Sequence, residues 1–208
     1  RVTLEVCDVM ATRAPDEVKA SSPKRPATAG QLHLLAFGDS LTAGGCGSEP
    51  YPAQLARLLQ GTGATVHNAG VCGESTVDMI ERLPEELIEL SREGVRPVFV
   101  LLMGGTNDLG CMEPQTILEN LAKLRAVVVR AEAVPVALAI PRAQDGLVPL
   151  AVAREVNRGL QAAAAEEDFL FVDVSVIPEK HLTDGVHFDS TGYGEMARLV
   201  FEELKRFL

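Results

Sequence analysis

"LHLLAFGDSLTAGG", residues 32–45, places an apolar run directly before a short stretch of small and polar residues. The run 32–37 is almost entirely apolar, which is typical of a strand buried on both faces of a parallel sheet. Immediately after it, Asp39 and Ser40 present a carboxyl and a hydroxyl group beside glycine. A simple turn at a strand end would account for these residues. They would equally suit a serine nucleophile, which needs a base elsewhere in the chain.

The same arrangement of apolar run, loop and amphipathic stretch recurs along the chain. Further apolar runs lie at 65–71, 97–103, 134–140 and 169–174. Helical patterns lie at roughly 51–60, 75–90, 114–132, 150–167 and 191–207. This alternation predicts an α/β protein, a three-layer α/β/α sandwich whose parallel sheet has right-handed crossovers. Residues 1–30 differ, and we expect an amino-terminal arm or linker there, with "RVTLEVCDV" as a possible edge strand before a domain over 31–208.

Composition limits the classes of partner. The chain has 208 residues, a net charge of −10 and no tryptophan, which disfavours nucleic acid as a partner. No stretch approaches the roughly 20 apolar residues of a membrane span, and residues 1–30 lack a secretory h-region. The four cysteines form no CxxC pair, which argues against zinc and slightly favours a reducing, cytoplasmic location. Because the chain begins with arginine, a removed upstream signal stays open.

His187 is the strongest candidate for the base that Ser40 would need. Asp184 precedes it by three residues. On a turn, this spacing lets the carboxylate accept the Nδ1–H of the imidazole while Nε2 faces the serine. The alternative is an Asx-type turn that caps the helix from Thr191. The remaining histidines are less suited. His33 and His67 lie within apolar strand runs, and His67 is expected to be a core histidine. His181 begins a loop.

Acyl transfer also needs hydrogen-bond donors where the tetrahedral oxyanion forms. Gly73 can offer a backbone N–H with no side chain in the way, and Asn107 can offer a side-chain amide. Ser40 can add its own N–H. A turn glycine and a loop-stabilising Asx bond are the alternatives for Gly73 and Asn107. Because parallel strands end at one edge of the sheet, these groups are expected to converge there.

Four blocks carry a resemblance to a known family. "GDSLTAG" with Ser40, "NAGVCGES" with Gly73, "GGTND" with Asn107 and "DGVH" with Asp184 and His187 resemble the GDSL or SGNH hydrolase superfamily, in its order. The likeness runs from about residue 34 to 207. It is closest to the small, single-domain lysophospholipase, thioesterase and arylesterase branch. It implies a flavodoxin-like five-stranded sheet, a Ser40–His187–Asp184 triad, an oxyanion hole of Ser40, Gly73 and Asn107, and neither cofactor nor metal.

Two departures and one rival serine accompany this resemblance. Phe188 and Asp189 follow His187, where relatives often have Pro-Asn, which alters the helix cap but spares the chemistry. Residues 1–30 have no counterpart. Ser75 stands in a second G-E-S, and we expect it to cap the helix that follows rather than to act as nucleophile.

The expected function is hydrolysis of short- to medium-chain acyl esters through an acyl-enzyme, with a small-molecule ester as partner. Substrate choice is expected in the loops 41–49, 109–113 and 141–150. Three thiols in loops at this edge of the sheet are expected to be buried and free: Cys46, Cys72 and Cys111. One alternative is a metal-dependent phosphoesterase with ligands Asp39, Asn107, Asp108 and His187. A non-enzymatic flavodoxin-like binding module is the other. Oligomeric state stays open.

Overall fold

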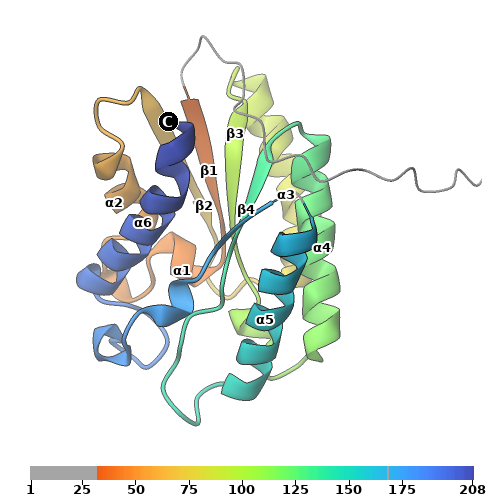
Figure 1. Cartoon of the computed structure of the whole chain (residues 1–208), viewed down its shortest axis with the longest axis vertical. Coiled ribbons are helices and arrows are strands. Elements are labelled where there is room, and N and C mark those ends of the chain that lie inside the picture. The colour runs from red at the N-terminus through yellow and green to blue at the C-terminus, as the bar shows by residue number, and fades with distance from the viewer. Residues whose placement is uncertain (1–31, 168) are drawn as a thin grey trace, which may run out of the picture.

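A computed structural model describes residues 32–167 and 169–208 of the chain (Figure 1). Five parallel strands form one sheet: β1 (Leu32–Gly38), β2 (Ala64–Gly70), β3 (Pro97–Met103), β4 (Val134–Leu138) and β5 (Leu170–Val172). Their order across the sheet is β2-β1-β3-β4-β5. This is the flavodoxin-like order. The predicted fold class is therefore confirmed, and the predicted strands agree with the observed ones to within a few residues.

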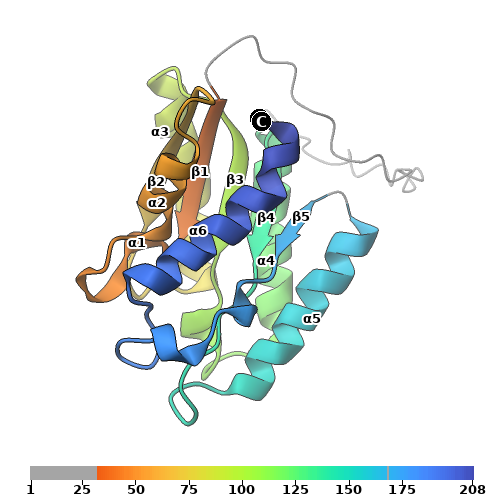
Figure 2. The ribbon, with the colours of Figure 1, turned by 60° about the vertical axis from the view of Figure 1, so that its left-hand side comes forward.

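Six helices connect and cover the strands: α1 (Ser40–Ala43), α2 (Tyr51–Leu58), α3 (Thr76–Arg92), α4 (Pro114–Arg130), α5 (Leu150–Glu166) and α6 (Ser190–Leu204). Short 3₁₀ turns add η1 (Gly45–Gly47), η2 (Thr106–Asp108), η3 (Val174–Val176), η4 (Glu179–His181) and η5 (Lys205–Phe207). Helices α2 and α6 pack on one face of the sheet, and α3, α4 and α5 on the other (Figures 1 and 2). The three layers follow from this arrangement.

Strand β1 shows why the apolar runs are continuous. Leu34 and Ala36 point into the core under α2 and α6, whereas Leu35 and Phe37 point into the core under α3, α4 and α5. All four side chains are fully buried. A strand covered on both faces has no solvent side, so it needs apolar residues at every position.

The helix that follows β2 begins as expected. Ser75 is the N-cap of α3: its hydroxyl accepts the Asp78 amide at 3.3 Å, and the Asp78 carboxylate accepts the Ser75 amide at 3.0 Å. This reciprocal capping box satisfies amides that have no partner within the helix. Asp189 is the N-cap of α6, and its carboxylate accepts the Gly192 amide at 2.7 Å without a reciprocal bond, because Gly192 has no side chain. The departure at Phe188 and Asp189 thus still leaves a good helix cap.

Two local expectations were wrong. His67 is not a core residue, because β2 is an edge strand and leaves the imidazole half-buried, with its Nε2 3.0 Å from Nδ1 of His33. Cys72 and Cys111 are free thiols as expected, but both are exposed rather than buried. The amino-terminal arm and its possible strand lie outside the described residues. No helix in the described part of the chain is long and apolar enough to cross a bilayer.

Candidate active site

The carboxyl ends of β1 and β3 define the crevice of the sheet. These two strands are neighbours, yet the chain leaves β1 towards α2 on one face and reaches β3 from α3 on the other. Loops therefore diverge at this point and leave room for a ligand, as is usual in open α/β sheets. Ser40 begins α1 directly after β1, and Asn107 lies in η2 directly after β3.

Three side chains predicted from two distant blocks of the sequence meet at this crevice. The hydroxyl Oγ of Ser40 lies 2.8 Å from Nε2 of His187, although 147 positions separate the two residues. On the other side of the ring, Nδ1 of His187 lies 2.7 Å from Oδ2 of Asp184. Both distances are those of hydrogen bonds. Ser40, His187 and Asp184 are called the candidate triad below.

Asp184 forms the Asx turn and also faces the imidazole of His187, but it does not cap the following helix. Its Oδ1 accepts the backbone amides of Val186 and His187 at 3.0 and 2.8 Å, which is an Asx turn. Its Oδ2 remains directed at the imidazole. The turn thus orients the acid, and the two readings of the sequence are compatible. The cap of the following helix is Asp189 instead.

Gly45 packs against the imidazole ring of His187. A Cβ atom built on Gly45 would lie 2.3 Å from Cδ2 and 2.7 Å from Nε2 of His187. No methyl group can occupy that position unless the ring moves. This contact could not be predicted from the sequence, because Gly45 belongs to a loop with several glycines.

Replacing Gly45 with alanine is expected to lower kcat by about a hundredfold, since a displacement of roughly 1 Å in a catalytic group has that effect. The matched control is Gly110→Ala, because a Cβ there meets nothing within 4 Å and Gly110 does not have a positive φ. Steady-state kinetics and melting temperatures of both variants check this. Equal rates for the two variants would contradict a role for the Gly45 contact.

The candidate oxyanion donors come from three loops at the same edge. Gly73 has φ of +80°, a conformation that glycine adopts without strain, and a Cβ there would meet nothing within 4 Å. The Asn107 amide donates one N–H to the carbonyl oxygen of Glu74 at 2.8 Å. That bond holds the side chain against the loop that carries Gly73. The second N–H of the Asn107 amide has no partner among the described residues and can donate to an oxyanion.

Asp108 links the loop that carries Asn107 to the start of α3, after the loop that carries Gly73. This role was not predicted from the sequence. It is buried, and its two carboxylate oxygens accept the Thr76 amide at 3.1 Å each. Oδ1 also accepts the Thr76 hydroxyl at 2.7 Å, and Asn120 donates to that hydroxyl at 3.0 Å. The carboxylate therefore fixes the start of α3 relative to η2. A metal site that used Asp108 would have to break these bonds, and the described residues contain no cluster of three or more metal-binding side chains.

Arg82 links the loop after β2 to the end of β1. Its guanidinium forms a two-pronged ion pair with the buried Glu74 carboxylate and donates to the Gly38 carbonyl at 3.4 Å. It also lies 4.0 Å from the centre of the Phe37 ring. Bidentate pairs of this kind add geometric specificity to the energy of the ion pair. No local sequence signal marks Arg82, which lies in the middle of α3.

Asp39 is buried directly beside the candidate nucleophile. Its side chain is 0% exposed, and Oδ1 accepts the Leu41 amide at 2.9 Å. Oδ2 has no hydrogen-bond partner among the described residues. Burial raises the pKa of this carboxyl to about 7, although the Leu41 amide and the nearby His187 oppose the shift.

One apolar side chain covers the turn that carries the acid and the base. A Cβ on Gly185 would lie 2.3 Å from Cδ1 of Leu147, so Leu147 touches this turn while remaining 54% exposed. Val71, just before the loop of Gly73, is 43% exposed. Apolar groups that stay in water beside a candidate site are suited to contact an apolar part of a ligand.

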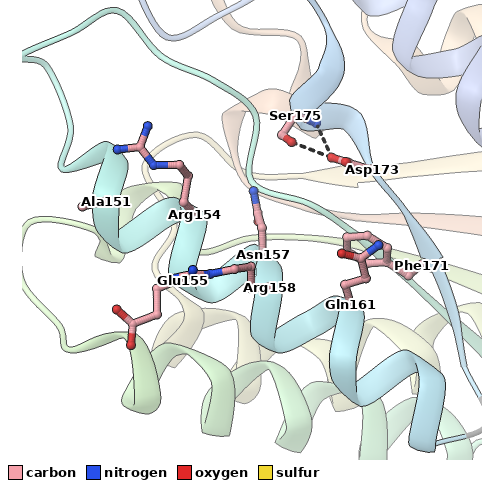
Figure 3. A pocket seen from close by; sticks show the side chains of 9 residues that line it. All are labelled: Ala151, Arg154, Glu155, Asn157, Arg158, Gln161, Phe171, Asp173 and Ser175. Atoms are coloured by element: carbon pink, nitrogen blue, oxygen red, sulfur yellow. Dashed lines mark hydrogen bonds between the residues drawn. The ribbon is translucent and has the colours of Figure 1, made fainter.

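A polar groove of about 430 Å³ between α5 and β5 lies apart from the candidate triad (Figure 3). The amide of Asn157 there is occupied, because it pairs with both the N–H and the carbonyl of Ile140 at 2.8 Å. Asp173 accepts the Ser175 amide at 3.0 Å and its hydroxyl, as Figure 3 shows. No residue of the candidate triad lines this groove. Its polar groups hold the ends of β4 and β5.

Comparison with known proteins supports a hydrolase. The model of the GDSL-like lipase/acylhydrolase family matches residues 36–194. A search of curated proteins found no match.

Solved structures share the fold. A carbohydrate acetylesterase family member from Sinorhizobium meliloti is 19% identical, with a TM-score of 0.73 over 85% of this chain and 99% of that one. The aryl esterase of M. smegmatis is 21% identical, with a TM-score of 0.71 over 85% and 100%. A lipase/acylhydrolase from Enterococcus faecalis is 25% identical, with a TM-score of 0.71 over 84% and 96%.

Proposed function

Because this chain belongs to the GDSL-like lipase/acylhydrolase family, we propose that it is a serine esterase that works through Ser40, His187 and Asp184. The observation that carries the proposal is the unbroken chain of contacts from Ser40 Oγ to His187 Nε2 and from His187 Nδ1 to Asp184. A hydroxyl, an imidazole and a carboxylate in this order form the arrangement that activates a serine for acyl transfer.

The reaction has two steps. His187 removes the proton from Ser40 as Oγ attacks the ester carbonyl, and the oxyanion forms among the Ser40 N–H, the Gly73 N–H and the Asn107 amide. His187 then protonates the leaving alcohol, which departs and leaves an acyl group on Ser40. In the second step His187 deprotonates a water molecule, which attacks the acyl-enzyme and releases the acid and the free serine.

The substrate proposed is an ester with a short to medium acyl chain. Leu147 and Val71 offer exposed apolar surface on the loops around the candidate triad. Because both side chains are exposed rather than enclosed, a long acyl chain would bury little additional apolar surface against them. The structural relatives are a carbohydrate acetylesterase family member, an aryl esterase and a lipase/acylhydrolase, which supports an ester as the substrate. A panel of p-nitrophenyl esters from acetyl to palmitoyl is expected to show the highest kcat/KM at or below octanoyl.

Asn107→Ala is expected to lower kcat by about 10²–10³-fold with little change in KM, because one oxyanion donor acts chiefly in the transition state. The matched control is Asn68→Ala, which removes an amide that instead bonds the Gly70 N–H in the sheet at 3.0 Å. Steady-state kinetics distinguish the outcomes. If Asn107→Ala raised KM and left kcat unchanged, Asn107 would be a ground-state binding residue and not an oxyanion donor.

A fluorophosphonate probe tests the proposed function itself. Such probes phosphonylate an activated serine, and peptide mass spectrometry locates the modified residue. Labelling is expected on Ser40 alone, with loss of esterase activity in proportion and no effect of EDTA on either. Full activity with Ser40 unlabelled would refute the proposal, and activity abolished by EDTA would favour the metal-dependent phosphoesterase.

A further inference from the structure

The Asp39 carboxyl group is an acid that the proposed mechanism does not use. It lies one residue before the nucleophile, is fully buried, and has one oxygen bonded to the Leu41 amide and the other without a partner among the described residues. An isolated charge in such a place is costly. A buried acid with one unpaired oxygen must therefore either remain protonated or have a nearby positive charge.

Among the described groups whose charges act on Asp39, His187 is the one that becomes positive during the proposed reaction, and its field favours the ionised form of this carboxyl. The attraction is mutual, because a pairwise electrostatic interaction stabilises both partners equally. Asp184, the other carboxylate near His187, is 43% exposed, so water screens its charge. A charge on buried Asp39 is screened far less.

We propose that Asp39 is a positioning residue for the proposed catalytic pair: it holds the Ser40 turn through the Leu41 amide, and its ionised carboxyl stabilises the imidazolium that His187 becomes. The inference rests on the proposed function of Ser40 and His187. Asp39 touches no reacting atom and acts through its neighbours. As the pH falls through the pKa of about 7, the carboxyl becomes neutral and this support disappears.

The other groups around Asp39 do not replace this role. The carboxylates of Asp108 and Glu74 oppose its ionisation, but Asp108 is held by Thr76 and Glu74 is paired with Arg82. Burial, aided by the charge of Asp39, raises the pKa of the Tyr51 phenol, so this neighbour on α2 stays neutral. The charge that responds to Asp39 is therefore that of His187.

The test compares the wild type with Asp39→Asn, which keeps an oxygen for the Leu41 amide but carries no charge. The readout is the rate of Ser40 phosphonylation by the fluorophosphonate probe between pH 4.5 and 9. Each proton that must leave before reaction adds one to the slope of log rate against pH on the acid side. Protonation of Asp39 is expected to slow the reaction without stopping it, so the acid-side slope of the wild type is expected to exceed that of the variant by less than one. The plateau of the variant is expected to fall about tenfold, the factor that one unit of pKa coupling represents.

A stability measurement gives a readout that does not depend on catalysis. A carboxyl whose pKa is raised in the folded state stabilises that state below its unfolded pKa and ceases to do so as the pH rises towards 7. The melting temperature of Asp39→Asn is therefore expected to rise relative to that of the wild type as the pH increases from 4.5 to 8. The same trend is expected when both proteins also carry Ser40→Ala. A constant difference over this range would contradict the raised pKa.

The outcomes separate the two proposals. Equal acid-side slopes, or equal plateaus, in the two proteins would overturn the role of Asp39 while leaving Ser40 as the nucleophile. Absence of Ser40 labelling at every pH would overturn the proposed function, and the role of Asp39 with it.

Discussion

Ser40→Ala is expected to lower kcat on a p-nitrophenyl ester by a factor on the order of 10⁶, as removal of the nucleophile does in other serine hydrolases. The hydroxyl Oγ of Ser40 lies 2.8 Å from His187 Nε2, the atom that would accept its proton. Without it no acyl-enzyme can form. The Ser40 side chain supports little else, because its helix is capped by Asp39 and Leu41 makes the core contacts. The melting temperature should therefore change little.

The matched control is Ser75→Ala, the serine of the second G-E-S. Its loss removes the cap of α3 and is expected to lower stability by about 1 kcal/mol. Activity should stay within about tenfold of the wild type, because Ser75 bonds to Asp78 and not to an imidazole. If Ser75→Ala abolished activity and Ser40→Ala did not, the nucleophile would have been assigned to the wrong serine.

Asp184→Asn is expected to lower kcat by about 10⁴-fold, the second largest effect. The amide can keep an oxygen for the Val186 and His187 N–H groups, so the turn should persist. Its NH₂ group, however, would face Nδ1 of His187 and would bind the tautomer that carries its proton on Nε2. Such an imidazole cannot accept the proton of Ser40. The defect is thus one of proton position and not of folding.

Asp189→Asn provides the control for this change. Asp189 lies in the same segment and caps α6 through the Gly192 amide, a task that asparagine performs as well. Its kcat is expected to remain within a few-fold of the wild type. A loss for Asp184→Asn no larger than that for Asp189→Asn would show that Asp184 does not orient His187.

The fold could be predicted because its signal is repeated and local. Each buried strand needs apolar residues on both faces, and each helix needs one apolar stripe, so five runs and the patterns between them were sufficient. Strand β2 is the exception: it carries His67 within an apolar pattern, yet it is the outermost strand of the sheet among the residues that the structure describes. The sequence of a single strand does not show whether that strand is central or outermost in the sheet, which explains why the burial of His67 was predicted wrongly.

The site could be predicted only in part, for a related reason. Reactive side chains next to strand ends are visible in the sequence, and the parallel sheet gathers those ends. The contacts of Arg82 with Glu74 and Gly38, and of Asp108 with Thr76, leave no such trace. They join helices and loops whose partners are set by packing, and a charged residue within a helix gives no sign of what it will face.

The order of apolar and polar residues alone determined the layers, the edge where chemistry can occur, and which hydroxyl, imidazole and carboxyl groups reach that edge. Tertiary structure decided what surrounds these groups: Gly45 packs against the imidazole of His187, and Asp39 loses all contact with water. Burial and distance depend on residues that are far apart in the chain, and the charge of a buried acid depends on both. Which groups are present is a local property, whereas how they ionise is a property of the whole fold.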